Sequence, residues 1–413
     1  MHLLYIVLSL GIIILLLFRK QIDFVAVGAV TFILYSIPCV SGETWVFSLG
    51  DFVYFDSVAS KTYLCVNLQL AVIFLFTCFV KTKDDDLSSY NISIDEVENK
   101  KSLFWRNLLI VCVIVFAYNI LFVVGLDKFF SDAHKSEVIE EFTGAMSIAT
   151  WGALACFFYF FARGEKTEYI ISFLMVFFLF ILGSRAYITT AILGAFFVKS
   201  NGSIRSFWDK AKIIIIGAVV VSFLAIYKYV YVAVRGLDFD SVEQILTDSD
   251  GVSFNLLNNE EFITVFSIYN YVVDSNFEFP IEDTVARCVS IIPFANSLID
   301  KHYSIRLADI AKDQFFGTHF GVGSNFWAES YAMGGILFVL LITVLWLFLL
   351  NIANDKLKRN KDRPFIVLVA TYCSFYIHRL DWVQVFGCMK NAILIYLLYM
   401  MFSIFVTMDK KII

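Results

Sequence analysis

Long apolar runs alternate with shorter polar segments along most of the chain. Many of the runs reach roughly 17–25 residues, the length that a helix needs to cross a hydrocarbon core of about 30 Å. We therefore expect an all-α, polytopic membrane protein. The pattern predicts eleven spans, at about 2–18, 24–40, 63–80, 104–124, 142–161, 168–183, 186–198, 213–232, 326–350, 364–380 and 388–408.

One polar segment is much longer than the others. Apolar residues recur within it at helical spacing, and Pro280 and Pro293 interrupt it, so we expect a few short helices that pack over the membrane helices. The chain divides accordingly into about eight N-terminal spans (1–234), a large loop (235–325) and about three C-terminal spans (326–413). A shorter polar segment, 41–62, is rich in aromatic residues and predicts a stretch that lies on the membrane surface.

The composition supports a membrane protein and the basic residues give its orientation. Hydrophobic residues make up 59% of the chain and charged residues 17%, against about 25% charged residues in typical soluble proteins. If the first span starts outside, 20 of the 32 lysines and arginines fall on the cytoplasmic side. By the positive-inside rule the large loop is then external and the C-terminus cytoplasmic.

Arginines gather on the predicted external face. Arg185, Arg235 and Arg379 lie at ends of spans, and Arg287 and Arg306 lie in the large loop. The planar guanidinium group binds phosphate oxygens at two points, so this set predicts a site for an anionic ligand. The alternative is that each arginine contacts lipid phosphates or pairs with a carboxylate.

A short polar sequence, His378-Arg379-Leu380-Asp381, ends the tenth predicted span. Asp381 could neutralise Arg379 in a structural pair. It could equally hold the guanidinium group in position for a phosphate, as a supporting residue does. The sequence leaves both interpretations open.

The external candidates for a general base are His302, His319, His378, Glu329 and the aspartates of the loop. His319 lies in a glycine-rich run directly before a span, where the backbone can approach an anion closely. Glu329 lies in the first turn of that span, where a carboxylate is costly to bury. A solvated histidine is the plainer interpretation of His319.

Other kinds of site have little support. The aspartates at 84–86, 238, 240, 248 and 250 are typical of solvated loops, and the cysteines have no paired spacing, so no metal site is expected. No nucleotide-binding loop stands out, and no basic patch suggests nucleic-acid binding.

Three motifs resemble those of Wzy-type O-antigen polymerases. Ile181-Leu182-Gly183-Ser184-Arg185-Ala186 is similar to the Gly-Ser-Arg turn of that family. Ile291-Ile292-Pro293, Gly321-Val322-Gly323-Ser324 and Ala328-Glu329-Ser330-Tyr331-Ala332-Met333-Gly334-Gly335 resemble its proline segment, glycine-rich run and Glu-x-Tyr-x-x-x-Gly helix start. His378-Arg379-Leu380-Asp381 resembles its arginine followed by an acidic residue, although here Leu380 separates the two, which leaves the role of Asp381 in question.

The resemblance implies a GT-C-type, inverting, metal-independent glycosyltransferase without a cofactor. Such an enzyme joins oligosaccharide repeat units held on undecaprenyl diphosphate, as donor and as acceptor, at the periplasmic face of the bacterial inner membrane. A chain-length regulator protein is a candidate partner beside the membrane lipids. On this hypothesis His319 or Glu329 assists the acceptor hydroxyl, Asp381 supports the site, and the donor diphosphate is held by Arg185, Arg235, Arg306 and Arg379.

Three other functions remain as alternatives. A flippase or other transporter of lipid-linked oligosaccharides predicts internal repeats and charged residues at mid-membrane, whereas the charges here concentrate at the faces. An O-antigen ligase would use a similar fold and donor with lipid A core as acceptor. A non-catalytic scaffold would leave the external arginines unexplained.

Overall fold

The computed structural model describes residues 1–413 except 20–21, 49–51, 81–95, 132–134, 201–222, 224–225, 228–229, 237, 248–259, 293–305, 317–322, 360–362 and 413. Within the described residues the fold is all-α apart from one β-hairpin. Its longer helices are α1 (His2–Phe18), α2 (Phe24–Tyr35), α4 (Ser60–Phe79), α5 (Glu96–Tyr118), α8 (Gly144–Arg163), α9 (Lys166–Ile181), α10 (Arg185–Ser200), α16 (Phe326–Arg359), α17 (Arg363–Phe375) and α18 (Trp382–Ile412).

Among the described residues, five helical segments are long and apolar enough to cross a membrane, so the chain has the character of a membrane protein. They are Ser60–Phe79, Ser102–Val124, Gly144–Arg163, Phe326–Leu357 and Trp382–Ile404. The second of these runs from α5 into the π-helix η1 (Asn119–Val124). Three shorter apolar helices accompany them, and most of the predicted span 213–232 lies outside the described residues, so the count of eleven stays a prediction.

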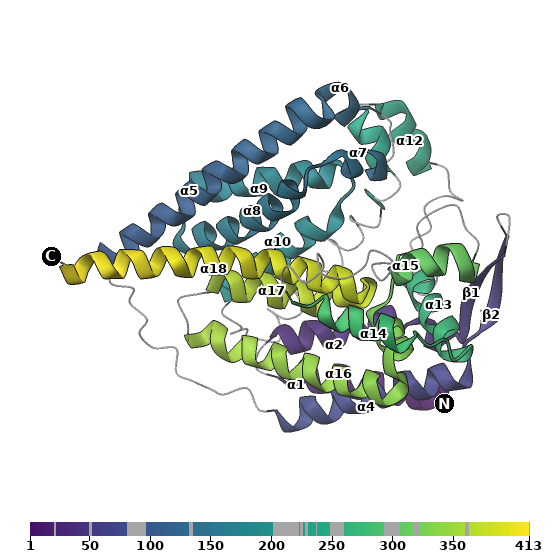
Figure 1. The fold of residues 1–413 in the computed structure, drawn as a ribbon. Helices are drawn as coiled ribbons and strands as arrows, with labels where there is room; N and C mark the ends of the chain where they lie inside the picture. Colours follow the sequence, from purple (N-terminus) through teal and green to yellow (C-terminus); the bar gives the residue numbers. More distant parts are fainter. Residues whose placement is uncertain are drawn as a thin grey trace.

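Helix α17 occupies the centre of the bundle, because it contacts α2, α8, α10, α16 and α18. On one side of it α8 packs against α5 and α9, and on the other α4 packs against α1 and α16 (Figure 1). The short 3-10 helix η5 (Ile377–Arg379) follows α17 and contacts α2 and α16.

The elements of the large loop gather at one end of the bundle (Figure 1). The N-terminus lies at this end and the C-terminus at the other. Helix α13 packs against α2, α4 and α16 and so fixes the loop to the membrane helices. The described loop elements are α12 (Phe239–Thr247), α13 (Glu260–Asp274), α14 (Ile281–Val289), α15 (Leu307–Ile310) and the π-helix η4 (Ala311–Phe316). Outside this loop, the short helices are α3 (Pro38–Ser41), α6 (Leu126–Phe129) and α7 (Lys135–Glu141).

The aromatic segment 41–62 contains an antiparallel hairpin rather than only a stretch that lies on the membrane. Strands β1 (Glu43–Ser48) and β2 (Phe52–Ser57) pair with Trp45 opposite Phe55. The alternation of aromatic residues with other residues is the pattern of a strand, which explains the difference. The hydroxyls of Thr44 and Ser267 are 2.6 Å apart and join β1 to α13.

Helix α16 is broken near its start by two glycines. Gly334 and Gly335 have non-helical backbone angles, and Gly335 has φ 65° and ψ −162°, a region that is essentially restricted to glycine. The carbonyl of Ala332, in the turn before the break, accepts a hydrogen bond from the backbone N–H of Phe279 at 2.8 Å. The break therefore sets apart a short first piece of α16, which holds Glu329.

Candidate functional site

Arg185 is placed by a sharp turn between α9 and α10. Gly183 has φ +87°, and a Cβ there would lie 2.8 Å from the ring of Tyr231, so only glycine fits without displacement. Helix α10 then begins at Arg185. The sequence prediction of two helices that meet at this arginine is confirmed.

Arg185 and Arg379 converge on one carboxylate, that of Glu261 in the first turn of α13. Arg185 Nη2 lies 2.8 Å from Glu261 Oε2, and Arg379 Nη1 contacts Oε1. The hydroxyl of Tyr35 also donates to Oε1, at 3.3 Å. We call Arg185, Arg379 and Glu261 the Glu261 cluster.

The Glu261 cluster carries one net positive charge, from two guanidinium groups and one carboxylate. It is partly open to solvent, since the side chains of Arg185, Arg379 and Glu261 are 14%, 28% and 18% exposed. A partly desolvated pair of arginines attracts an anion more strongly than exposed side chains do. The cluster is therefore suited to an anionic ligand that reaches the end of the bundle.

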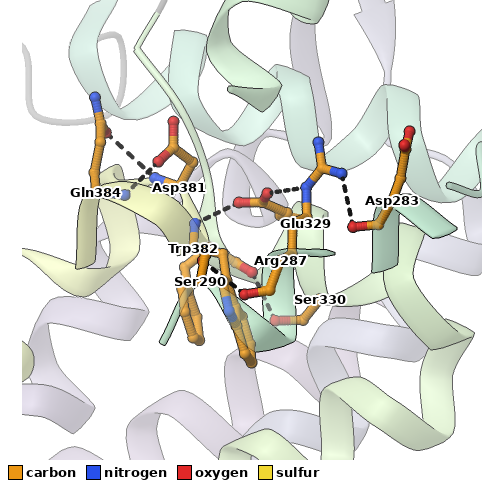
Figure 2. Close-up of polar contacts among 9 residues, drawn as sticks. Asp283, Arg287, Ser290, Glu329, Ser330, Asp381, Trp382 and Gln384 are labelled. Carbon is orange, nitrogen blue, oxygen red and sulfur yellow. Dashed lines mark hydrogen bonds and ion pairs between the residues drawn. The ribbon is translucent and has the colours of Figure 1, made fainter. Parts of the chain in front are cut away.

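A second polar cluster is buried where α14 of the large loop meets α16 and α18, and it ties the three helices together (Figure 2). Arg287 of α14 pairs with Glu329 of α16 at 2.7 Å, and the two side chains are 2% and 0% exposed. The other oxygen of Glu329 accepts from the backbone N–H of Trp382 at the start of α18. The Arg287 guanidinium also lies 3.7 Å from the centre of the Phe279 ring.

These contacts bear on the role expected for Glu329, which stays a prediction. Both of its carboxylate oxygens are engaged, one by Arg287 and one by Trp382. A general base needs a lone pair that faces the substrate hydroxyl. Glu329 therefore fits a structural role, in which it joins α14, α16 and α18.

Asp381 caps α18 instead of holding Arg379. Its Oδ1 accepts from the backbone N–H of Gln384 at 2.7 Å, and no hydrogen bond described for it involves Arg379. Burial raises the pKa of this carboxyl group to about 7, and the nearby Glu329 adds to the increase. The supporting role expected for Asp381 is thus not what its described contacts indicate.

The described contacts of Arg235 and Arg306 are with residues outside the Glu261 cluster. Arg235 is buried, and its Nε donates to the carbonyl of Ser131 at 2.8 Å. Arg306 is exposed and pairs with Asp309 at 3.0 Å. No described contact joins either arginine to the Glu261 cluster.

None of the histidine candidates can be assigned as a general base from the described residues. His319 and His302 lie outside the described residues. His378 is buried among aromatic rings, and its Nδ1 accepts from the indole N–H of Trp327 at 2.9 Å. The described contacts of this ring are therefore packing contacts within the bundle.

Within the described part of the chain, no three histidine, cysteine, aspartate or glutamate side chains come together as metal ligands. The aspartates at 84–86, 248 and 250 lie outside it.

The sequence does not indicate Glu261, because its segment looks like any loop in which acidic residues precede an apolar run. It places Arg287 on the external face but does not give its pairing with Glu329, because the two residues are 42 positions apart. The one usable signal was the cost of burying Glu329, which predicts a cationic partner.

Comparisons with protein-family models, with curated proteins and with solved structures found no match for this chain. Its function is therefore argued from the residues and their geometry.

Proposed function

We propose that this protein is a Wzy-type O-antigen polymerase in the bacterial inner membrane. It joins undecaprenyl-diphosphate-linked oligosaccharide repeat units at the periplasmic face by inverting, metal-independent glycosyl transfer. The observation that carries the proposal is the convergence of Arg185 and Arg379 on Glu261, a residue of the large loop.

The chemistry of the leaving group calls for such a pair of arginines. When the bond between the donor sugar and its phosphate breaks, negative charge develops on the lipid diphosphate. Preorganised cations aimed at that charge lower the barrier. The Glu261 carboxylate marks the point that both guanidinium groups reach, and we propose that a phosphate oxygen of the donor takes its place.

The lipid part of the substrate needs an apolar surface beside this site. Helices α5, α16 and α18 present many exposed large hydrophobic side chains, among them Ile114, Leu341 and Leu397. Such a surface is compatible with membrane lipids and with a polyprenyl chain that enters from the bilayer.

Binding of undecaprenyl diphosphate to the purified protein in lipid nanodiscs tests the anion site. Arg185→Ala and Arg379→Ala should each weaken binding about 10–100-fold, because each removes a charge-assisted hydrogen bond. Arg106→Ala is the matched control, since Arg106 pairs with Glu165 and Glu168 away from the cluster. Unchanged binding in both cluster variants would remove the basis of the proposal.

Surface polysaccharide from cells that lack the gene distinguishes the related functions. Single repeat units on lipid A core in the null strain, with full ladders restored by the wild-type gene, identify a polymerase. No repeat unit on the core indicates a ligase or a flippase and contradicts the proposal. Arg185→Ala and Arg379→Ala, at normal protein levels, should not restore the ladder.

A further inference from the structure

The turn that carries Arg379 also carries a carboxylate oxygen without a partner. Asp381 is buried, its Oδ1 caps α18, and its Oδ2 has no hydrogen-bond partner among the described residues. Figure 2 shows this second oxygen directed away from Glu329. A buried polar atom without a partner is costly and rare. The helix cap accounts for one oxygen of Asp381 and leaves the other unexplained.

Asp381 faces ionisable groups from three elements. Glu329 approaches it from α16, Arg306 and Asp309 from the start of α15, and Cys388 from α18 itself. Of these groups, Arg306 is 47% exposed and so in contact with solvent.

We infer that Asp381 accepts the proton of the acceptor hydroxyl in the transfer reaction, an inference that rests on the function proposed above. The acceptor oxygen bonds to the anomeric carbon of the donor sugar as the bond from that carbon to the phosphate oxygen breaks. The hydroxyl proton moves to Asp381 Oδ2. The lipid diphosphate leaves with the bonding electron pair and stays with Arg185 and Arg379.

The position of Asp381 in the chain suits this role. Chain geometry keeps the Cα atoms of Arg379 and Asp381 within about 7 Å of each other. Burial raises the pKa of Asp381 to about 7, with Glu329 adding to the increase and Arg306 opposing it. A general base is most effective when its pKa lies near the working pH.

Asp381→Asn separates catalysis from structure, because asparagine caps a helix about as well as aspartate and has the same shape. Nanodisc protein would be assayed with lipid-linked repeat units extracted from the null strain. We expect the wild-type rate to rise with pH up to about 7 and then level off. The variant should be about 10²–10⁴-fold slower and lose this rise, while it binds undecaprenyl diphosphate as the wild type does. Asp274→Asn removes an exposed carboxylate at the end of α13 and should keep the wild-type rate and profile.

The outcomes separate this inference from the proposed function. If Asp381→Asn keeps a rate within about threefold of wild type, far from the loss expected of a missing base, the inference is wrong while the polymerase stands. If the variant is slow because it no longer binds undecaprenyl diphosphate, Asp381 is structural and the inference is also wrong. If the wild-type protein neither binds the diphosphate nor extends the extracted repeat units, the proposed function fails, and this inference fails with it.

Discussion

Arginine–carboxylate pairs serve two purposes in this protein, and the exposure of each pair separates them. The pair of Arg287 and Glu329 is shut off from water, so it is fixed and joins helices. In the Glu261 cluster two arginines share one carboxylate, and all three side chains are partly exposed. At the residue scale, exposure therefore separates a fixed buried pair from a cluster that solvent can reach.

Loss of one partner of the buried pair should destabilise the protein strongly. Glu329→Ala leaves the Arg287 guanidinium group without its charge partner in a buried environment, which typically costs about 3–5 kcal/mol. Thermal unfolding of the detergent-solubilised protein measures the effect. Lys128→Ala, which breaks an exposed ion pair with Glu141, should cost about 0–1 kcal/mol. Similar losses in both variants would contradict the structural role of the buried pair.

The raised pKa of Asp381 makes a prediction about stability and pH. Between its unfolded pKa, about 4, and its folded pKa, about 7, the folded protein binds more protons at this site than the unfolded chain. The contribution of Asp381 to stability therefore decreases as the pH rises through this window. The Asp381→Asn variant has no carboxyl group to titrate at this position. The unfolding temperature of the variant minus that of the wild type should therefore be larger at pH 8 than at pH 5. A constant difference would show that the pKa is not raised.

At the scale of elements, helices interrupted at glycines place the polar clusters. Gly183 ends one helix so that Arg185 can start the next, and the break at Gly334 and Gly335 sets the first turns of α16 apart. The sequence predicts the first interruption, because the predicted spans 168–183 and 186–198 leave Arg185 between them. It does not predict the second, because glycines in an apolar run are common in membrane helices.

Gly335→Ala tests the break in α16. Nothing lies within 4 Å of a Cβ added at Gly335, so the substitution causes no clash. Its cost comes from the backbone conformation at φ +65°, which is unfavourable for alanine. We expect a loss of about 1–3 kcal/mol in unfolding free energy. Gly387→Ala in α18, which also has open space and no positive φ, should be neutral or stabilising by up to about 1 kcal/mol. Equal changes in the unfolding temperature of the two variants would argue against a break in α16 at Gly335.

The whole molecule shows what hydrophobic patterning can and cannot predict. Apolar runs located most of the helices, because burial in lipid and helix length leave a strong periodic signal. These runs do not identify Glu261 as the residue that both Arg185 and Arg379 contact. The ends of predicted spans indicate on which side of the membrane a residue lies, but not which residues are neighbours on that side. Packing around α17 supplies those positions, and it depends on contacts between distant segments.

Cys288 provides a test of the predicted orientation. It is exposed on α14 in the large loop, whereas Cys78, also exposed, lies within the apolar helix α4. A membrane-impermeant maleimide applied to intact spheroplasts, where the external face is accessible, should label the wild-type protein. Cys288→Ala should abolish this labelling and Cys78→Ala should not. Labelling at Cys288 only after the membrane is permeabilised would place the loop in the cytoplasm.

The order of synthesis gives the Glu261 cluster a further property. Arg379 follows Arg185 by 194 residues, so at a synthesis rate of about 5–20 residues per second it emerges about 10–40 s later. Until then the nascent chain holds only Arg185 and Glu261 of the cluster. A chain that terminates before α17 therefore never completes the cluster, because Arg379 lies beyond that helix.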